Sequence, residues 1–388
     1  MKKNRSLLLV GSIWVVARAW VLFLLIQLPW VPYDVALYEK WSKLLLAGSF
    51  PVADSMWQYP DLVAAVLVLP HAFPWSYITN FVLVTLAVDA LIMFLSLRNF
   101  RTRSGSIIGP VLWASAGFWT GPVLLTRLDL YPTLLAVLAL IVTRPWLSAV
   151  FAGVGAGLKV WPAAIVAGWR AKTAVTSILI LIATFGLTTL VVRLFIPEGD
   201  SFISNQINRG LQAESVGVLP YLIRGLFGAD PTFIASNGTL EIVSSQAELI
   251  GAGLTLFGVV IVISITLLNW FGRLPNLHPA DIFFTTVTVL IATNRVFSPQ
   301  FYIWLAGLGS IALIYRASIV RIPMILIVLS SISAQYIYPL NSGLETAETD
   351  ALIVQIIRLI LFLVELSLLL FRIGRTALES KRSAMQEK

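Results

Sequence analysis

Long apolar runs alternate with short polar stretches along the whole chain, and most of the runs have the length of a membrane-spanning helix. A helix needs about 20 mainly apolar residues to cross the hydrocarbon layer of a bilayer. The runs lie at about 6–28, 77–97, 106–124, 130–143, 146–158 with 161–170 as a broken pair, 173–195, 248–269, 281–297, 300–315, 320–338 and 351–371. This pattern predicts an all-α integral membrane protein with about twelve transmembrane helices, organised as a single domain over residues 1–388.

The stretch after the first run differs from an ordinary connecting loop. In "DVALYEKWSKLLLAG", from Asp34 to Gly48, apolar residues recur at helical spacing, which predicts an amphipathic helix on the outer membrane surface. The apolar segment 62–73 is too short to cross comfortably, so we expect it to dip into the outer leaflet and return. Two long outer loops then follow, at about residues 29–76 and 197–247.

The distribution of charge supports this topology. Basic residues of membrane proteins collect in cytoplasmic loops, and about 17 of the 27 lysines and arginines fall in the predicted inner loops and tails. The chain begins with the basic sequence "MKKNRS", so its N-terminus is expected on the cytoplasmic side. The first span therefore carries Asp34 to the outer face of the membrane.

Composition narrows the class of protein further. The chain is 58% hydrophobic and only 12% charged, with a mean hydropathy of +0.88, which excludes an ordinary soluble domain. Its net charge of +8 comes from the predicted inner loops and does not indicate nucleic-acid binding. The chain has no cysteine and two histidines, so we expect no disulfide and no metal site built from these residues. We expect that no metal and no cofactor is required, although Asp54, Asp61 and Asp129 leave a metal site open.

Most polar residues outside the spans fall into a few short stretches at the outer membrane boundary. They include Asp34 with Tyr38, Tyr59 in "WQYPDL", Arg127 with Asp129 in "TRLDLYP", Lys159 in "GLKVWP", Arg209 with Gln212 and Glu214 in "NRGLQAES", and Gln300 in "SPQF". Arginine and lysine suit phosphate, and carboxylates recognise or deprotonate hydroxyl groups. Together these residue types favour a substrate that is anionic, rich in hydroxyls and anchored in lipid.

Several of these residues also have a purely structural interpretation. Asp34 comes at the start of the predicted surface helix and could serve only as its cap. Lys159 could be a snorkelling anchor at the end of a span, as could Arg193. Interfacial tryptophans and tyrosines often form no more than an aromatic belt. The residues alone leave these alternatives open.

Charged residues inside the spans suggest ion pairs between or within helices. Arg18 lies in the middle of the first span and Asp89 in the middle of the next one, and each would be costly in lipid without a partner. We expect the two to pair and to fix the first two spans against each other. Arg358 and Glu365 lie on one face of the last span and could pair in the same way.

The order of these motifs resembles the GT-C superfamily of polyprenyl-phosphate-sugar glycosyltransferases, and within it glycosyltransferase family 87. The matching stretches are "YDVALY", "WQYPDL", "TRLDLYP", "GAGLKVWP", "RGLQAES" and "FSPQFYIWL", spread over most of the chain. Members of that family include polyprenyl-phosphate-mannose-dependent mannosyltransferases of actinobacteria. The family usually has "YPP" where this chain has "YPD" with Asp61.

The resemblance implies an enzyme of the cell membrane with its active site on the extracytoplasmic side. By family analogy it would transfer mannose from a polyprenyl-phosphate donor to a lipid-linked or polysaccharide acceptor. The family's catalytic aspartate maps onto Asp34, the expected general base, and its second acidic motif maps onto Asp129. Arg209, Arg127 and Lys159 are the candidates for binding the donor phosphate. Tyr38, Tyr59, Asp129, Gln212, Glu214 and Gln300 are the candidates for binding substrate.

A different class of function is also compatible with this sequence. A transporter or flippase of lipid-linked saccharides would need charged groups and a cavity within the membrane but no catalytic base. It predicts a polar path across the bundle, whereas the polar residues here gather at one face. The expected partners in either case are membrane lipids and a lipid-linked sugar.

Overall fold

The computed structural model describes residues 2–28, 30, 32–197, 209–229, 231–236, 238–340 and 343–386. The chain divides into two compact units, which are described separately below. Unit 1 comprises residues 1–163, 175–208 and 306–314, and unit 2 comprises residues 164–174, 209–305 and 315–388. The prediction of a single domain stays a prediction, because a division by contact density does not test independent folding.

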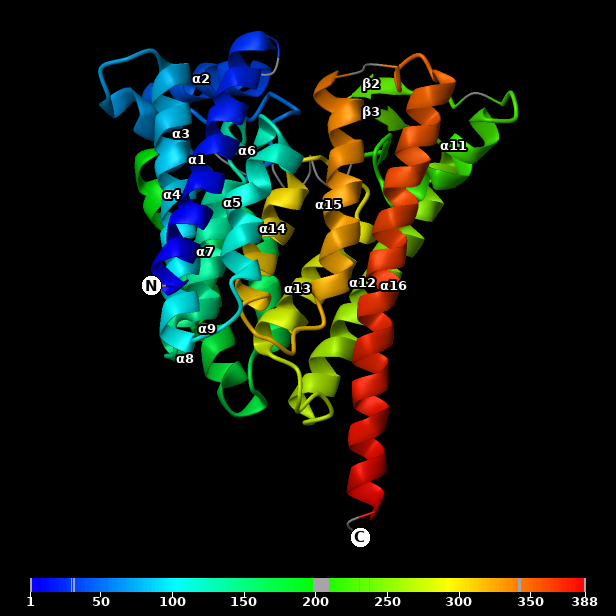
Figure 1. Ribbon diagram of the computed structural model, residues 1–388. Helices are drawn as coiled ribbons and strands as arrows, with labels where there is room; N and C mark the ends of the chain where they lie inside the picture. Colours follow the sequence, from blue (N-terminus) through cyan, green and yellow to red (C-terminus); the bar gives the residue numbers. More distant parts are fainter. Residues whose placement is uncertain are drawn as a thin grey trace. The chain divides into compact units, whose positions relative to one another are not determined.

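Unit 1 is built from helices of very different lengths (Figure 1). They are α1 (Lys2–Gln27), α2 (Tyr33–Leu46), α3 (Val63–Val68) with the 3-10 turn η1 (Leu69–Ala72), α4 (Tyr77–Arg103), α5 (Ile108–Thr120), α6 (Val123–Thr126), α7 (Leu130–Ile141), α8 (Pro145–Leu158), most of α9 (Ala171–Phe195) and the last part of α14 (Phe301–Ala312). The 3-10 helix η2 (Trp161–Gly168) takes the place of the second half of the predicted broken pair, and it lies mostly in unit 2.

Residues 62–73 do not carry the chain from one end of the α1 and α4 pair to the other. The helix α2, which follows α1, contacts the start of α4, since the rings of Tyr38 and Phe81 lie 5.5 Å apart. Ser76 caps α4 by accepting a hydrogen bond from the backbone N–H of Thr79. Further along, Arg18 meets Asp89, so α1 and α4 run antiparallel. This arrangement agrees with the predicted dip of residues 62–73.

The predicted pair of Arg18 and Asp89 is confirmed. Nη2 of Arg18 lies 2.5 Å from Oδ1 of Asp89, and its Nε donates to Oδ2 at 2.9 Å. Both side chains are buried. Next to them α1 and α5 pack closely at Gly117, where an added Cβ would lie 2.6 Å from the carbonyl oxygen of Ala17. Small residues allow such close packing of helices in membranes.

The described residues of unit 2 form further apolar helices and a small sheet. The helices are α12 (Ser245–Trp270), α13 (Pro279–Ala292), α15 (Arg321–Gln335), which continues into a π turn η4 (Tyr336–Leu340), and α16 (Thr349–Gln386). Within the predicted loop 197–247 lie η3 (Val216–Val218), α11 (Leu219–Gly225) and the strands β1 (Leu211–Gln212), β2 (Ile234–Ser236) and β3 (Thr239–Ile242). The strands form an antiparallel sheet of order β1-β3-β2, which the expectation of a purely helical chain had missed.

The expected pair of Arg358 and Glu365 on α16 is wrong. Arg358 forms an ion pair with Glu214 from the segment after β1 and donates to the carbonyl oxygen of Phe297 at 3.0 Å. Seven residues separate Arg358 from Glu365, about 10.5 Å along the helix axis, too far for a direct contact. Both carboxylate oxygens of Glu365 are buried and have no hydrogen-bond partner among the described residues.

Among the residues that the structure describes, six helices are long and apolar enough to cross a membrane. These are the helical segments Arg5–Gln27, Tyr77–Arg103, Ala171–Phe195, Ser245–Trp270, Arg321–Tyr338 and Thr349–Ser383. The other apolar helices, such as Leu130–Ile141 and Pro279–Ala292, have 10–17 residues. The structure is thus mostly helical and typical of a membrane-embedded chain, while the count of about twelve spans and the GT-C type stay predictions.

Candidate active site

The helix α2 presents Asp34 in its first turn, but Asp34 does not cap that helix. The N-cap residue is Pro32, and no side chain accepts a hydrogen bond from the first turn. The carboxylate of Asp34 instead forms an ion pair with Arg127, a residue 93 positions further along the chain. The structure therefore argues against a simple capping role for Asp34. A carboxylate in the first turn of a helix still interacts favourably with the helix dipole.

Arg127 and Asp129 lie in the short connection between α6 and α7. Gly121, with φ at +63°, ends α5, and Arg127 is extended, so the chain turns sharply before α7 begins at Leu130. Asp129 occupies the N-cap position of α7 without capping it. Its Oδ1 accepts a hydrogen bond from Nζ of Lys159 at 2.7 Å.

Lys159 belongs to this cluster because α8 ends there. The backbone of Lys159 is extended, with φ at −152° and ψ at 137°, so its side chain leaves the helix direction and reaches Asp129. Its ammonium group also lies 5.7 Å from the centre of the Tyr59 ring, within the range of a cation–π contact. The position of the Lys159 side chain is therefore explained by Asp129 and Tyr59, and not by snorkelling at the end of a span.

Two phenols complete the cluster, of which Tyr38 is buried and Tyr59 is partly buried. The hydroxyl groups of Tyr38 and Tyr59 lie 3.4 Å apart. Burial raises the pKa of the Tyr38 hydroxyl well above its usual value, and burial together with the nearby Asp129 raises the pKa of Tyr59 to about 12. Both phenols are therefore neutral at physiological pH. Tyr59 is partly exposed and can donate a hydrogen bond to an oxygen of a ligand, whereas Tyr38 is buried and supports Tyr59.

An aromatic cluster supports the phenols from one side. Trp41 lies 5.3 Å from Trp57 and 6.2 Å from Tyr59, measured between ring centres, and its Nε1 donates to Asp54 at 3.0 Å. Trp41 and Trp57 are almost fully buried, so in this structure they form a core and not an exposed belt. This rigid packing fixes the segment that carries Tyr59.

Asp61 and Arg193 form a third ion pair in unit 1. Nε of Arg193 lies 2.7 Å from Oδ2 of Asp61, which is buried. Arg193 is therefore not the unpaired anchor at the end of α9 that the sequence suggested. Asp61, at the position where the resembling family has a proline, has a structural partner in this chain.

Exposure distinguishes the two carboxylates of the cluster. The side chain of Asp34 is 18% exposed and that of Arg127 is 14% exposed, whereas the side chain of Asp129 is 2% exposed. A ligand can therefore reach Asp34 and Arg127 directly. Asp129 is suited to holding Lys159, which is itself 17% exposed, in a fixed position.

The cluster has no net charge in this state. The charges of Asp34 and Asp129 are balanced by those of Arg127 and Lys159. An anionic ligand would therefore be strongly attracted only if Arg127 or Lys159 moved from its carboxylate partner to the ligand. A narrow crevice next to Lys159 is lined by apolar side chains, among them Val63, Leu128 and Leu158.

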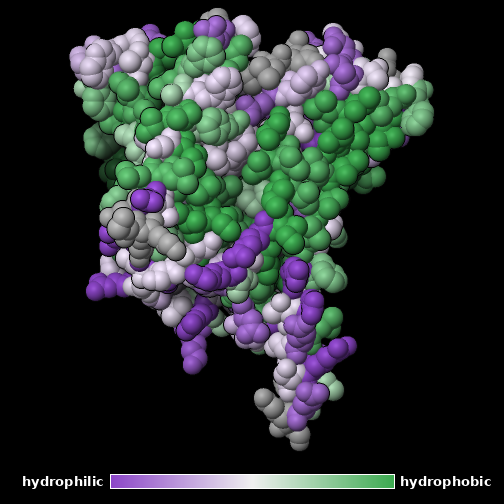
Figure 2. Space-filling model, viewed as in Figure 1, coloured by the Kyte–Doolittle hydropathy of each residue, from purple (hydrophilic) through white to green (hydrophobic). Residues whose placement is uncertain are grey.

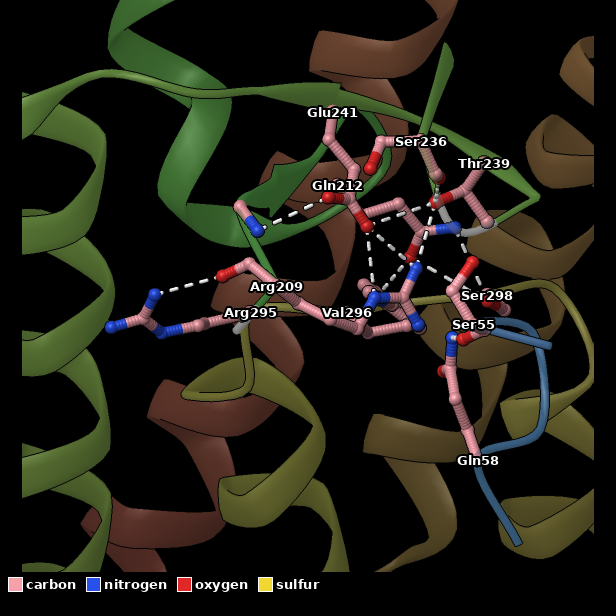
Figure 3. Close-up of polar contacts among 12 residues, drawn as sticks. Ser55, Gln58, Arg209, Gln212, Ser236, Thr239, Glu241, Arg295, Val296 and Ser298 are labelled. Carbon is pink, nitrogen blue, oxygen red and sulfur yellow. Dashed lines mark hydrogen bonds and ion pairs between the residues drawn. The ribbon is translucent and has the colours of Figure 1, made fainter. Parts of the chain in front are cut away.

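The remaining predicted site residues belong to unit 2, where they take part in a different network (Figure 3). The guanidinium group of Arg209 is buried and pairs with Glu241 at 2.8 Å, and its Nη2 donates to Oγ1 of Thr239 at 2.7 Å. Oε2 of Glu241 also accepts from the backbone N–H of Gly210 at 3.1 Å. Arg209 thus binds two side chains of strand β3. Its predicted role in binding phosphate stays a prediction.

Gln212 and Glu214 also hold neighbouring segments together. Oε1 of Gln212 accepts from the backbone N–H of Phe297 at 2.8 Å, and Glu214 forms the ion pair with Arg358. Gln300 lies directly before α14 and is partly exposed. The predicted substrate-binding roles of Gln212, Glu214 and Gln300 stay predictions.

Sequence reasoning missed Glu241, the partner of Arg209. The segment "TLEI" offered one signal, because a single acidic residue in an otherwise apolar and β-branched stretch is expected to have a partner if it is buried. Within the part of the chain that the structure describes, no group of three or more histidines and acidic residues could hold a metal ion. The expectation that the protein needs no metal or cofactor is not tested by that observation.

Comparison of this chain with family models, with curated proteins and with solved structures finds no match.

Proposed function

We propose that this chain is a membrane glycosyltransferase that takes a sugar from a polyprenyl-phosphate donor. The acceptor would be a hydroxyl group of a glycolipid or polysaccharide. The observation that carries this proposal is the cluster of Asp34, Arg127, Asp129 and Lys159 with Tyr38 and Tyr59. Residues of four separate chain segments converge there, and all six were predicted from the motifs.

The proposed site lies on the extracytoplasmic side of the cell membrane. Within unit 1, Arg5 near the start of α1 and the arginines at positions 98, 101 and 103 at the end of α4 lie at one end of the antiparallel pair. The helix α2 with Asp34 follows the other end of α1. Since basic residues favour the cytoplasmic side, the end with Asp34 is assigned to the outside.

Asp34 is the proposed general base. General-base catalysis by a well-placed side chain contributes about 10²–10⁴ in rate. Asp34 is the accessible carboxylate of the two in the cluster, while Asp129 is occupied by Lys159 and shielded from a ligand. The proton of the acceptor hydroxyl would move to Asp34 as the hydroxyl oxygen attacks the anomeric carbon.

Arg127 and Lys159 are the proposed ligands of the donor phosphate. Arginine can offer two parallel hydrogen bonds to a phosphate, and lysine adds a compact positive charge. Arg127 would exchange the carboxylate of Asp34 for the phosphate when the donor binds. That exchange would leave the carboxylate of Asp34 available to the acceptor hydroxyl in the same step.

The proposed reaction balances without a further reactant. The bond between the anomeric carbon and the acceptor oxygen forms while the bond from that carbon to the phosphate oxygen breaks. The electrons of the broken bond stay with the polyprenyl phosphate, whose charge Arg127 and Lys159 stabilise. Because the attack comes from the face opposite the phosphate, the configuration at the anomeric carbon is inverted.

The test is an assay with the purified full chain in lipid vesicles and synthetic polyprenyl-phosphate mannose, glucose or arabinose, each with a panel of glycolipid acceptors. We expect a product heavier than its acceptor by one sugar residue, and mannose as the preferred donor by family analogy. Movement of the intact donor across the membrane with no new glycoside would refute catalysis and favour the transporter or flippase.

A further inference from the structure

The helix α16 is much longer than a membrane requires. It has 38 residues, from Thr349 to Gln386, which corresponds to a length of about 57 Å, against about 30 Å for the hydrocarbon layer. The sequence predicted only the segment 351–371. Figure 1 shows the C-terminal part of this helix as a separate projecting rod, and in Figure 2 its free end is largely purple.

The projecting part carries a basic face next to an apolar stripe. Its basic side chains Arg372, Arg375, Lys381 and Arg382 are exposed, and one acidic residue, Glu379, forms an exposed ion pair with Arg375 at 2.7 Å. Exposed pairs of this kind are weak, so a lipid phosphate can replace Glu379. Phe371, Leu378 and Met385 are 64%, 62% and 70% exposed. These three residues are spaced by seven, so they lie along one side of the helix.

This stripe does not suit a coiled coil with a second copy of the chain. A coiled coil needs apolar residues at two positions in each heptad. Between Phe371, Leu378 and Met385 the second position would fall on Gly374 or Arg375 and on Lys381 or Arg382. An apolar line bordered by lysine and arginine is instead typical of a helix that lies in the interface of a membrane.

Gly374 is a position in α16 at which the helix can bend. It lies where the apolar span passes into the basic segment, and an added Cβ there would meet no atom within 4 Å. Close packing therefore does not require a glycine at this position. Glycine in a helix interior lowers helix stability relative to alanine, and it permits bending of the backbone.

Another basic residue at this end of unit 2, Arg321, indicates which face of the membrane the segment contacts. Arg321 begins α15, which runs antiparallel to α16, since Ser330 donates to the carbonyl oxygen of Arg358 and Tyr336 to Asp350. Arg321 and the basic part of α16 therefore lie at the same end of unit 2. Basic juxtamembrane segments bind the anionic lipids of the cytoplasmic leaflet.

We propose that the segment from Gly374 to Gln386 bends at Gly374 and lies on the anionic surface of the cytoplasmic leaflet. Leu378 and Met385 enter the boundary between headgroups and acyl chains, and Arg375, Lys381 and Arg382 bind lipid phosphates. The partner is a lipid surface of negative charge, and the contact does not depend on the proposed glycosyl transfer.

The experiment uses the absence of cysteine in the chain. A fluorophore sensitive to its surroundings is attached to Met385→Cys or, as a matched control on the opposite side of the helix, to Ser383→Cys. The full chain is reconstituted in vesicles of phosphatidylcholine alone or with phosphatidylglycerol, with a nitroxide-labelled lipid as quencher. We expect quenching at position 385 only in the anionic vesicles and none at position 383. Adding Arg375→Gln, Lys381→Gln and Arg382→Gln should abolish it.

Two further results decide the proposal. Gly374→Ala fits the straight helix sterically, so it should leave folding intact and reduce the quenching at position 385; unchanged quenching would refute a bend at Gly374. A label at position 385 that stays in water in both kinds of vesicle overturns the lipid contact. Efficient disulfide formation between copies at position 385, without lipid quenching, would overturn it in favour of pairing between two chains.

Discussion

The ion pair of Arg18 and Asp89 allows a quantitative prediction about stability. Arg18 makes two hydrogen bonds to Asp89 and donates to the carbonyl oxygens of Ala114 at 2.6 Å and Trp113 at 3.1 Å. Asp89 also accepts from Nε1 of Trp14 at 2.7 Å. Removing one partner of a buried pair costs about 3–5 kcal/mol, because the other charge is left uncompensated.

The two single variants should differ in a definite direction. In Arg18→Met the carboxylate of Asp89 keeps the hydrogen bond from Trp14, whereas in Asp89→Leu the guanidinium group keeps two carbonyl oxygens and the rings of Trp14 and Trp113 as neutral partners. We therefore expect Arg18→Met to be the more destabilising change. The double variant should be more stable than either single variant, which requires a coupling energy larger than the greater single loss of about 3–5 kcal/mol.

The assay is thermal unfolding of the four proteins in one detergent. One kcal/mol shifts the midpoint of a domain of 150–250 residues by about 2–4 °C, so each single variant should lower it by roughly 6 °C or more. The double variant should recover part of that loss. If the double variant loses the sum of the two single losses, the pair contributes no coupling and the account of α1 and α4 is wrong.

Three further predictions concern the titratable side chains of Arg127, Glu365 and Tyr59. Arg127→Lys keeps the charge but not the paired hydrogen bonds, so it should weaken donor affinity about tenfold or more, worth about 1.4 kcal/mol, in a titration with polyprenyl-phosphate sugar, and unchanged affinity would remove Arg127 from the phosphate site. Glu365→Leu removes a buried carboxylate that has no partner among the described residues, and it should raise the unfolding midpoint; a loss of stability would mean that Glu365 has a partner. The pKa of Tyr59 is raised from about 10 to about 12, so the stability that depends on its neutral form is present below pH 10 and lost as the pH rises through 12. Tyr59→Phe should therefore show a smaller decrease of the unfolding midpoint between pH 9 and pH 11 than the unchanged chain, and equal slopes would refute this.

The predictable part of the fold follows from local patterns. Helix α2 was expected from the spacing of Val35, Tyr38 and Trp41, which are all buried on one face. The pairing of Arg18 with Asp89 followed from the cost of a lone charge in lipid. The site residues of unit 1 were predicted because polar groups at the outer ends of spans must lie near one plane.

The parts that were missed depend on contacts far apart in the sequence. No local pattern shows that Arg358 prefers Glu214, 144 residues earlier, over Glu365 on its own helix. The strands β1, β2 and β3 have two to four residues each, too short for a clear alternation of apolar and polar positions. The helical extension of α16 to Gln386 lacks the apolar composition by which spans were identified.

The central claim is that Asp34 is the base of a glycosyl transfer, and single-turnover transfer by Asp34→Asn tests it most directly. Asparagine keeps the size of the side chain but cannot take the acceptor proton, so transfer should fall by about 10²-fold or more while the protein folds and still binds donor. Glu39→Gln is the matched control, because Glu39 lies on the same helix and pairs only with the exposed Lys43 at 2.7 Å among the described ion pairs. The account predicts near-normal transfer by Glu39→Gln and almost none by Asp34→Asn, and near-normal transfer by Asp34→Asn would contradict it.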